Sequence, residues 1–282
     1  MQLFLRDDLA SAWEGKDPFE QAACQQGDIF REREGRRTLR FHVGETSYFL
    51  KYHGGIGWRE IIKNLTQAKL PVLGAMQEVN AVDAVRSAGL DTMTVVGYGA
   101  RGRNPASLQS FIVTEDLVHT LSLEDLGESW LEEGTVPVCF KRQLICRVAD
   151  IAGRMHRAGI NHRDFYIAHF LIPKNAAAEH DATGPLYLID LHRSQVRRSV
   201  PWRWQVKDLG GLYFSTARYG MTRRDVLRFL KVYFGDDLRA VLKRHARLLN
   251  ASRREGEKIY RRYYEKPPGF PLQYNDHPGK DI

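Results

Sequence analysis

The sequence predicts an α+β fold with two lobes, in which an antiparallel sheet and one helix come first and a mostly helical lobe follows. Runs of aromatic and β-branched residues alternate with turn residues over 28–52. Val138–Ala158 then repeats apolar residues at helical spacing, and helical patterns continue after it. We therefore expect a sheet lobe at 1–116, a helical lobe at 117–266 and an irregular tail at 267–282.

The sheet is expected to open as a β-meander, because period-two runs are separated by turns at Gly35 and Gly44. A helix is predicted after the meander, at 73–88, and two further apolar runs follow that helix. The five expected strands lie at 28–33, 37–42, 47–52, 92–97 and 109–113.

A lysine and a glutamate of this lobe form the first candidate pair. Lys51 ends the third strand, and Glu78 lies in the first half of the helix at 73–88, beside its apolar face. A carboxylate there can pair with the lysine ammonium and hold it in place. Each residue alone is more typical of a solvated surface, so the order of the surrounding motifs favours the pair. Because no G-x-G-x-x-G motif precedes Lys51, a plainer hairpin is expected to cover the phosphates.

Two loops of the first lobe are candidates for nucleotide contact. Thr114–Leu117 lies at the expected lobe boundary, where backbone groups can read an adenine edge. The carbonyl of Glu115 and the amide of Leu117 are the candidate groups. The glycine-rich insert at 53–72 carries Trp58 and is either a flap over the site or a loop that spans two elements.

The stretch 160–171 carries the chemistry. It contains His162-Arg163-Asp164, with His169 five residues after the aspartate. A carboxylate at Asp164 can accept or orient a hydroxyl proton, and a ligand at His169 can reach a magnesium ion held against phosphates. A bare His-Arg-Asp arises by chance in roughly a few per cent of such chains, as part of a solvated loop. Asp190, at the end of a buried strand, adds a second loop carboxylate and favours phosphoryl transfer.

The net charge of +8 is concentrated in one segment. Residues 221–262 contain 13 Lys or Arg against 5 Asp or Glu. A solvated helix face is the ordinary explanation, but such a surplus also favours an anionic partner: an anionic membrane surface, a phosphorylated glycan or a small acidic protein. No nucleic acid is expected, because no binding motif accompanies the charge. Three helices are expected in this region, at 222–234, 236–249 and 250–264.

Cysteine usage and hydropathy indicate a reducing compartment. The three cysteines are odd in number and include no C-x-x-C pair. The N-terminus has no apolar run of signal length, and nowhere do 18 apolar residues run together. A cytoplasmic protein is expected, with any membrane contact peripheral.

In their order along the chain, these motifs resemble the eukaryotic-protein-kinase-like fold over residues 28–265. The runs HRDFYIAHFLI, LIDLHR and KDLGGLYFS resemble the bacterial lipopolysaccharide core heptose(I) kinase family, whose members phosphorylate the inner-core heptose at its 4-hydroxyl with ATP. The resemblance implies Mg²⁺, an inner-core glycolipid acceptor, and Asp164 as catalytic base beside Arg163. It also implies Lys51 on the ATP phosphates, Glu78 as its partner, Asp190 as a magnesium ligand, and His169 in the place of a metal-binding Asn.

Departures from typical protein kinases bear on the acceptor. Asp190-Leu-His replaces Asp-Phe-Gly, and only about a dozen residues separate His192 from the next helix, so no long segment is available to dock a peptide. A glycan acceptor fits this better. Arg193 and Arg197 suit its carboxylates and phosphates. Asp208, on that next helix, is expected to bind backbone amides of the catalytic loop.

Two other functions stay open. One is a protein (tyrosine) kinase or autokinase, which 12 tyrosines and an Arg-Arg-Tyr-Tyr run at 261–264 would serve. The other is a catalytically weak binding module that uses the basic helices as a scaffold. The presence of Lys51, Glu78, Asp164 and Asp190 counts against the binding module.

Overall fold

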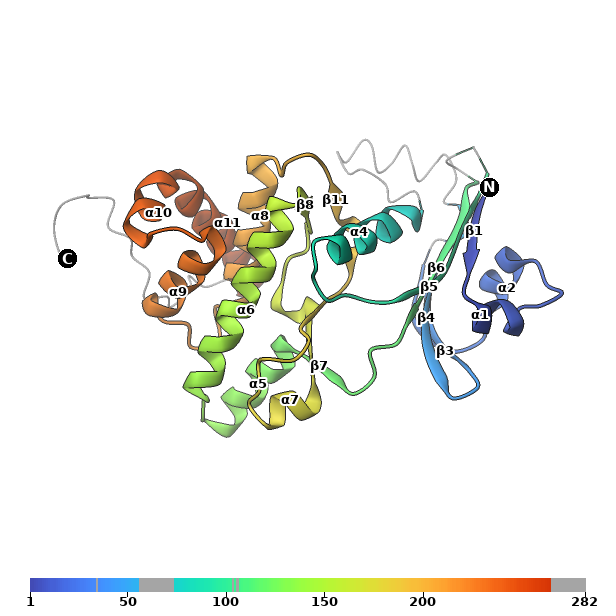
Figure 1. Cartoon of the computed structure of the whole chain (residues 1–282), viewed down its shortest axis with the longest axis horizontal. Coiled ribbons are helices and arrows are strands. Elements are labelled where there is room, and N and C mark those ends of the chain that lie inside the picture. Colours follow the sequence, from blue (N-terminus) through green and yellow to red (C-terminus); the bar gives the residue numbers. More distant parts are fainter. Residues whose placement is uncertain (34, 56–73, 103, 105–106, 265–282) are drawn as a thin grey trace. The chain divides into compact units, whose positions relative to one another are not determined.

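The computed structural model describes residues 1–33, 35–55, 74–102, 104 and 107–264. They adopt a kinase-like α+β fold with an antiparallel sheet and a mostly helical region (Figure 1). The insert expected to be either a flap or a spanning loop lies outside the described residues from residue 56 on, and so does the expected tail at 267–282.

Contacts divide the chain into two compact units. The first unit comprises Met1–Thr120 together with Tyr187–Arg197, and the second comprises Leu121–Leu186 together with the described residues from Arg198 on. The segment that contains Asp190 therefore folds with the sheet, although it lies far along the sequence.

The sheet of the first unit has six antiparallel strands rather than the five expected from the sequence. The missed strand is β1, which pairs with β5 from Gln2 opposite Ala100 to Leu5 opposite Gly97. The strand order is β1-β5-β6-β4-β3-β2. The strands are β1 (Gln2–Leu5), β2 (Asp28–Arg33), β3 (Arg36–Val43), β4 (Thr46–His53), β5 (Val95–Arg101) and β6 (Gln109–Glu115).

Alternation of apolar residues places one face of the sheet in the core. On β4, Tyr48, Leu50 and Tyr52 are buried, and every second residue between them faces the other way. Sequence reasoning missed two short helices, α1 (Asp7–Ala12) and α2 (Pro18–Cys24). From these helices and the residue after α1, the buried side chains Leu9, Trp13 and Phe19 pack in the same core cluster as this face of the sheet.

The strand expected at 92–97 instead runs over Val95–Arg101 and contains two glycines. A Cβ at Gly97 would lie 2.7 Å from Leu9 Cδ2, and a Cβ at Gly99 would lie 2.7 Å from the ring of Phe111 and 2.9 Å from that of Phe19. Both positions therefore require glycine, because any larger residue would clash with side chains packed against the strand.

Helix α4 (Met76–Ser87) buries Val79, Val82 and Val85. It packs against the segment around Asp190, and Gln77 Nε2 donates to the carbonyl of Ser194 at 2.8 Å. Within the first unit this segment contains β10 (Tyr187–Leu188) and β11 (Gln195–Val196).

The second unit is built around α6, whose apolar stripe follows the predicted period. Helix α11 packs along α8, and α9 packs on α6. No helix among the described residues is both long enough and apolar enough to cross a membrane. The helices are α5 (Leu123–Glu133), α6 (Val138–Arg157), α7 (Lys174–Ala178), α8 (Trp202–Thr216), α9 (Arg223–Phe234), α10 (Leu238–Arg244) and α11 (Ala246–Tyr264), with short strands β7 (Thr120–Ser122), β8 (Ile160–Asn161) and β9 (Phe170–Pro173).

The boundary expected at 249/250 was wrong, because the break between the last two helices falls at His245. Asp237 caps the start of α10 by accepting from the amides of Arg239 and Ala240. The ring of His245 stacks on Phe234 with centroids 4.1 Å apart, which fixes the chain where α10 ends.

Candidate active site

Lys51 lies on β4 between two carboxylates of the first unit. Its Nζ is 2.7 Å from Glu78 Oε1 and 3.1 Å from Asp190 Oδ1. Glu78 is buried on α4, which explains why a helix residue that looked solvated can serve as a fixed counterion. Burial disfavours the charge on Lys51, but the two carboxylates outweigh it and raise the pKa of the ammonium. The ion pair expected between Lys51 and Glu78 is therefore present.

Asp190 is held by a second donor that sequence reasoning missed. His192 Nδ1 lies 2.8 Å from Asp190 Oδ1, and the Asp190 backbone has a φ of 61°. Burial opposes ionisation of this carboxylate, but His192 and Lys51 outweigh it and hold the pKa of Asp190 well below its usual range. The left-handed backbone is a strained conformation for a non-glycine residue and is typical of functional sites.

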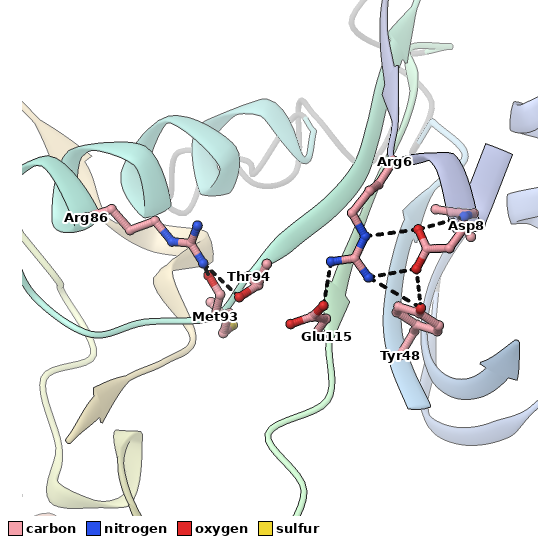
Figure 2. A network of polar contacts seen from close by, with 8 residues as sticks. Arg6, Asp8, Tyr48, Arg86, Met93, Thr94 and Glu115 are labelled. Atoms are coloured by element: carbon pink, nitrogen blue, oxygen red, sulfur yellow. Dashed lines mark hydrogen bonds and ion pairs between the residues drawn. The ribbon is translucent and has the colours of Figure 1, made fainter. Parts of the chain in front are cut away.

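The segment Thr114–Leu117, called the hinge below, is connected to the N-terminal segment by a network of hydrogen bonds and ion pairs (Figure 2). The Arg6 guanidinium lies between Asp8 and Glu115 and donates to both carboxylates. Tyr48 OH donates to Asp8 at 2.6 Å, and Arg6 together with Tyr48 holds the pKa of Asp8 well below its usual range. The side chain of Glu115 is therefore engaged, which leaves its backbone as the part of the residue that can meet a nucleotide.

Part of the hinge backbone already forms hydrogen bonds within the first unit. The amide of Glu115 donates to the carbonyl of Thr94 at 2.9 Å. Thr94 is held in turn by Arg86, whose guanidinium donates to its hydroxyl and to the carbonyl of Met93 (Figure 2). The amide of Leu117, the other predicted adenine contact, forms no hydrogen bond with any residue that the structure describes.

The catalytic loop of the second unit is anchored by a buried carboxylate. Asp208, on α8, accepts from the amides of His162 and Arg163, both at 2.7 Å. The expected role of Asp208 is thus confirmed. His156 Nε2 lies 3.2 Å from the same carboxylate, and its Nδ1 lies 2.7 Å from the hydroxyl of Tyr233 on α9. These buried contacts fix the loop that carries Asp164.

His169 is oriented by the loop itself. Its Nδ1 lies 2.7 Å from the carbonyl oxygen of Asp164, and its ring stacks on His162 with centroids 5.5 Å apart. A carbonyl oxygen only accepts, so Nδ1 carries a proton, and in the neutral ring Nε2 then has the lone pair. This is the tautomer in which an imidazole binds a metal through Nε2.

Arg163 has a left-handed backbone with φ of 76°. Its guanidinium lies 4.6 Å from the ring centre of Trp204, the third residue of α8. Sequence reasoning placed Arg163 beside Asp164, the expected base, but did not identify Trp204 as its neighbour.

Arg193 and Arg197, which are predicted to bind the acceptor glycan, belong to the first unit. Both are half-buried, and Arg197 donates to the side chain of Gln195 at 2.6 Å. Of the predicted residues, Lys51, Glu78 and Asp190 are thus brought together in the first unit, and Asp164, Arg163 and His169 in the second.

A cavity of about 220 Å³ lies within the second unit, apart from the polar residues above. Its wall is mainly apolar and comes from helices that are distant in sequence, so no local pattern could have revealed it. Lys141 also lines it, paired with Asp225 at 2.9 Å. Each of six helices contributes a large apolar side chain: Leu126, Leu144, Leu212, Phe229, Leu242 and Leu249.

These features define the class of protein. A sheet unit holds a lysine between a helix glutamate and a loop aspartate, and a helical unit holds an aspartate loop by its backbone amides. Both are parts of a kinase-fold phosphotransferase.

The chain belongs to the lipopolysaccharide kinase (Kdo/WaaP) family, whose sequence pattern matches residues 20–233. It is 50% identical over 262 residues to the lipopolysaccharide core heptose(I) kinase WaaP of Pseudomonas aeruginosa, covering 93% of this chain and 97% of that protein. It is 48% identical over 264 residues to WaaP of Escherichia coli, covering 93% and 98%. A solved structure described as WaaP in complex with acyl carrier protein matches with a TM-score of 0.78 at 44% identity, covering 92% of this chain and 100% of that one. The chain is accordingly an enzyme, a kinase that transfers phosphate to a sugar.

Proposed function

We propose that this kinase transfers the γ-phosphate of ATP to the 4-hydroxyl of heptose I in the inner core of lipopolysaccharide, at the cytoplasmic face of the inner membrane. The observation that supports phosphoryl transfer most directly is Lys51 between Glu78 and Asp190. The similarity to core heptose(I) kinases over 93% of the chain supports the acceptor.

In this proposal each polar residue has one task. Lys51, kept charged by its two carboxylates, binds the phosphates of ATP. Main-chain groups of Glu115 and Leu117 bind the adenine edge. Asp164 orients the acceptor hydroxyl and takes its proton, while Asp208 keeps the loop rigid through its amides. Arg193 and Arg197 contact acidic groups of the acceptor.

The residues fit a magnesium ion at Asp190. Its carboxylate is a hard oxygen ligand that stays ionised, which is the donor type magnesium prefers. His169 offers Nε2, a softer ligand that would complete the site less tightly. When bound, magnesium would neutralise charge on the transferring phosphate.

The acceptor is tested by supplying the purified protein with labelled ATP and three acceptors in separate reactions. These are dephosphorylated core glycolipid, a generic tyrosine-containing protein and buffer alone. Label on the glycolipid, with NMR placing the phosphate on the heptose 4-hydroxyl, supports the proposal. Label on the protein acceptor or on the enzyme alone would establish the tyrosine kinase or autokinase alternative instead. No label in any reaction would leave the binding-module alternative.

We also propose a small acidic acyl carrier protein as a partner. The similar solved structure is described as such a complex. The exposed cations of α10 and α11 would attract an acidic protein. The cavity of about 220 Å³ exceeds the roughly 150 Å³ apolar space that admits benzene, so an acyl chain carried by the partner could enter it.

A further inference from the structure

A series of aromatic rings in the second unit begins in the catalytic loop and ends on the last turns of α11. The ring of Tyr166, two residues after Asp164, lies edge-on to Phe214 of α8, with ring centres 6.1 Å apart. Phe214 in turn contacts three tyrosines of α11, with ring centres between 5.4 and 6.3 Å away: Tyr260, Tyr263 and Tyr264. The series therefore connects the segment that carries the proposed base to the end of α11.

Close packing of α8 on α11 and on the loop holds these rings in place. A Cβ at Gly256 of α11 would lie 2.8 Å from the carbonyl oxygen of Gly210 on α8. A Cβ at Gly211 would lie 3.2 Å from the ring of Tyr166. Glycine lets the backbones approach this closely. Because the rings are already fixed by their neighbours, a ligand that stacks on them has little side-chain freedom to remove.

The far end of the series is open to solvent. Tyr263 is 72% exposed and Tyr264 is 39% exposed, whereas Tyr166, Phe214 and Tyr260 are half-buried. Large aromatic side chains that are gathered at a surface, rather than scattered singly, are typical of an interaction site.

The polar groups beside these rings are of both signs. The Arg218 guanidinium lies 5.9 Å from the ring centre of Tyr264, and its Nη1 lies 3.1 Å from Glu128 Oε1. Tyr219 OH donates to the same carboxylate oxygen at 2.7 Å. Because Arg218 and Glu128 pair with each other and are both partly exposed, they offer donors and acceptors without an excess of either charge.

A sugar ring matches both parts of this surface. Its apolar C–H face can stack on aromatic rings, whose faces carry negative charge. Its hydroxyl groups need a few well-placed polar partners, which Arg218 and Glu128 provide. A glycan acceptor must also reach the catalytic loop, whereas a lipid surface need not. The continuity of the rings from Tyr166 outward therefore favours the acceptor as the occupant.

We propose that Phe214, Tyr263 and Tyr264 form a subsite that stacks on a sugar of the acceptor next to the one that is phosphorylated. Arg218 and Glu128 bind the hydroxyls of that sugar, and Tyr166 continues the surface to Asp164. This subsite rests on the proposed function and adds to it the recognition of a neighbouring sugar.

The test compares Tyr263→Ala/Tyr264→Ala and Tyr263→Phe/Tyr264→Phe with the wild type. The Phe pair keeps both rings and removes only the hydroxyls. Trp202→Ala is the matched control, because it removes another exposed aromatic residue from the opposite end of α8. Each protein receives two water-soluble acceptors, the dephosphorylated core oligosaccharide and a methyl heptoside that contains the reacting sugar alone. Calorimetry without ATP measures oligosaccharide binding, and turnover with ATP gives kcat/KM for each acceptor.

We expect the Ala pair to raise the Kd for the oligosaccharide about ten-fold. The ratio of kcat/KM for the oligosaccharide to kcat/KM for the methyl heptoside should fall by the same factor, because the heptoside does not reach the rings. The Phe pair should restore most of the loss, and Trp202→Ala should bind like the wild type. Melting temperatures of all variants are measured, and if the Ala pair melts well below the wild type, the single change Tyr263→Ala replaces it.

The inference is overturned if the Ala pair binds the oligosaccharide as the wild type does, or if kcat/KM falls equally for both acceptors. Sedimentation with vesicles of phosphatidylglycerol and phosphatidylethanolamine examines the other occupant. Loss of vesicle binding with normal oligosaccharide binding would assign the rings to a lipid surface and also overturn the inference. If the wild type transfers phosphate to neither acceptor, the proposed function is wrong, while calorimetry still decides whether the rings bind a glycan.

Discussion

At the scale of single residues, the site depends on donors that hold carboxylates in their ionised form. Asp190 is held by Lys51 and by His192, the residue that stands where a typical kinase has glycine. The His192 imidazole, two residues further along the chain, contacts one oxygen of the Asp190 carboxylate and so fixes the orientation of that side chain. This preorganisation suits the proposed role of Asp190 as a magnesium ligand, which requires the carboxylate to keep its charge.

His169 gives a prediction about the second metal ligand. An asparagine at this position keeps a polar ligand, whereas an alanine removes it. His169→Asn should therefore retain activity close to that of the wild type, while His169→Ala should need several-fold more magnesium for half-maximal turnover. The measurement is a magnesium titration of kcat for the three proteins. Equal and mild effects of both substitutions at every magnesium concentration would show that His169 only packs in the loop.

His53 gives a prediction about pH. Burial, together with Arg36 and Lys51, lowers the pKa of His53 from 6.5 to about 4, and its Nδ1 is buried with no hydrogen-bond partner among the described residues. The unfolded chain therefore binds the extra proton between these pH values. The free energy of unfolding should fall as the pH drops, and His53 should account for ~2 kcal/mol of the loss between pH 7 and pH 5.

Denaturant titrations at both pH values check this. His53→Asn should lose less stability on acidification than the wild type does. His42→Asn, at an exposed position on β3, serves as the matched control and should behave like the wild type. If the wild type and the two variants lose equal stability, the folded protein does not exclude a proton from His53.

Sequence reasoning reached the residues whose partners are implied by motif order. Lys51 with Glu78, and Asp208 with the catalytic loop, could be predicted because each motif sets the role of the next. The network of Arg6 with Glu115 could not be predicted, since its partners are 109 residues apart and no local pattern links them. The contact of the Arg163 guanidinium with the ring of Trp204 was also missed.

At the scale of elements, local periodicity predicted those elements whose packing is also local. Helix α6 and the hairpin strands β3 and β4 follow their apolar patterns closely. Strand β5 was misplaced because Gly97 and Gly99 look like breakers until α1 and α2 are seen to pack on them. Strand β1 was missed because it is only four residues long and its partner among the described strands, β5, lies about ninety residues away.

The basic helices α10 and α11 give a prediction about partners. Arg239, Lys243, Arg244 and Arg247 are all exposed, and only Arg244 has an acidic partner, Asp236 at 2.9 Å, among the described residues. Changing all four to Glu should remove a co-purifying acyl carrier protein and weaken sedimentation with anionic vesicles, because both depend on positive charge. Turnover on a short water-soluble core oligosaccharide should change little.

The control carries Arg142→Glu and Lys174→Glu, two exposed positions of the same unit outside these helices. Loss of the carrier protein with normal vesicle binding identifies a protein-docking face. Loss of vesicle binding alone identifies a membrane-docking face. If neither property changes, the cations are a solvated helix surface and the docking proposal fails.

At the scale of the whole molecule, charge and hydrophobic space are distributed unevenly. The net charge of +8 equals the surplus of Lys and Arg over Asp and Glu in residues 221–262, and three helices that include those residues also line the apolar cavity. The residues proposed to carry out phosphoryl transfer lie on other elements. The positive charge suits the proposed acidic or membrane partner, which it would attract.

The central claim is that Asp164 acts on a core glycolipid hydroxyl, and the turnover of Asp164→Asn with dephosphorylated core glycolipid and ATP tests it most directly. The substitution keeps the size of the side chain and removes the base, so kcat should fall by about 10³-fold or more while the melting temperature stays close to that of the wild type. Retention of more than about a tenth of the wild-type turnover would contradict the account.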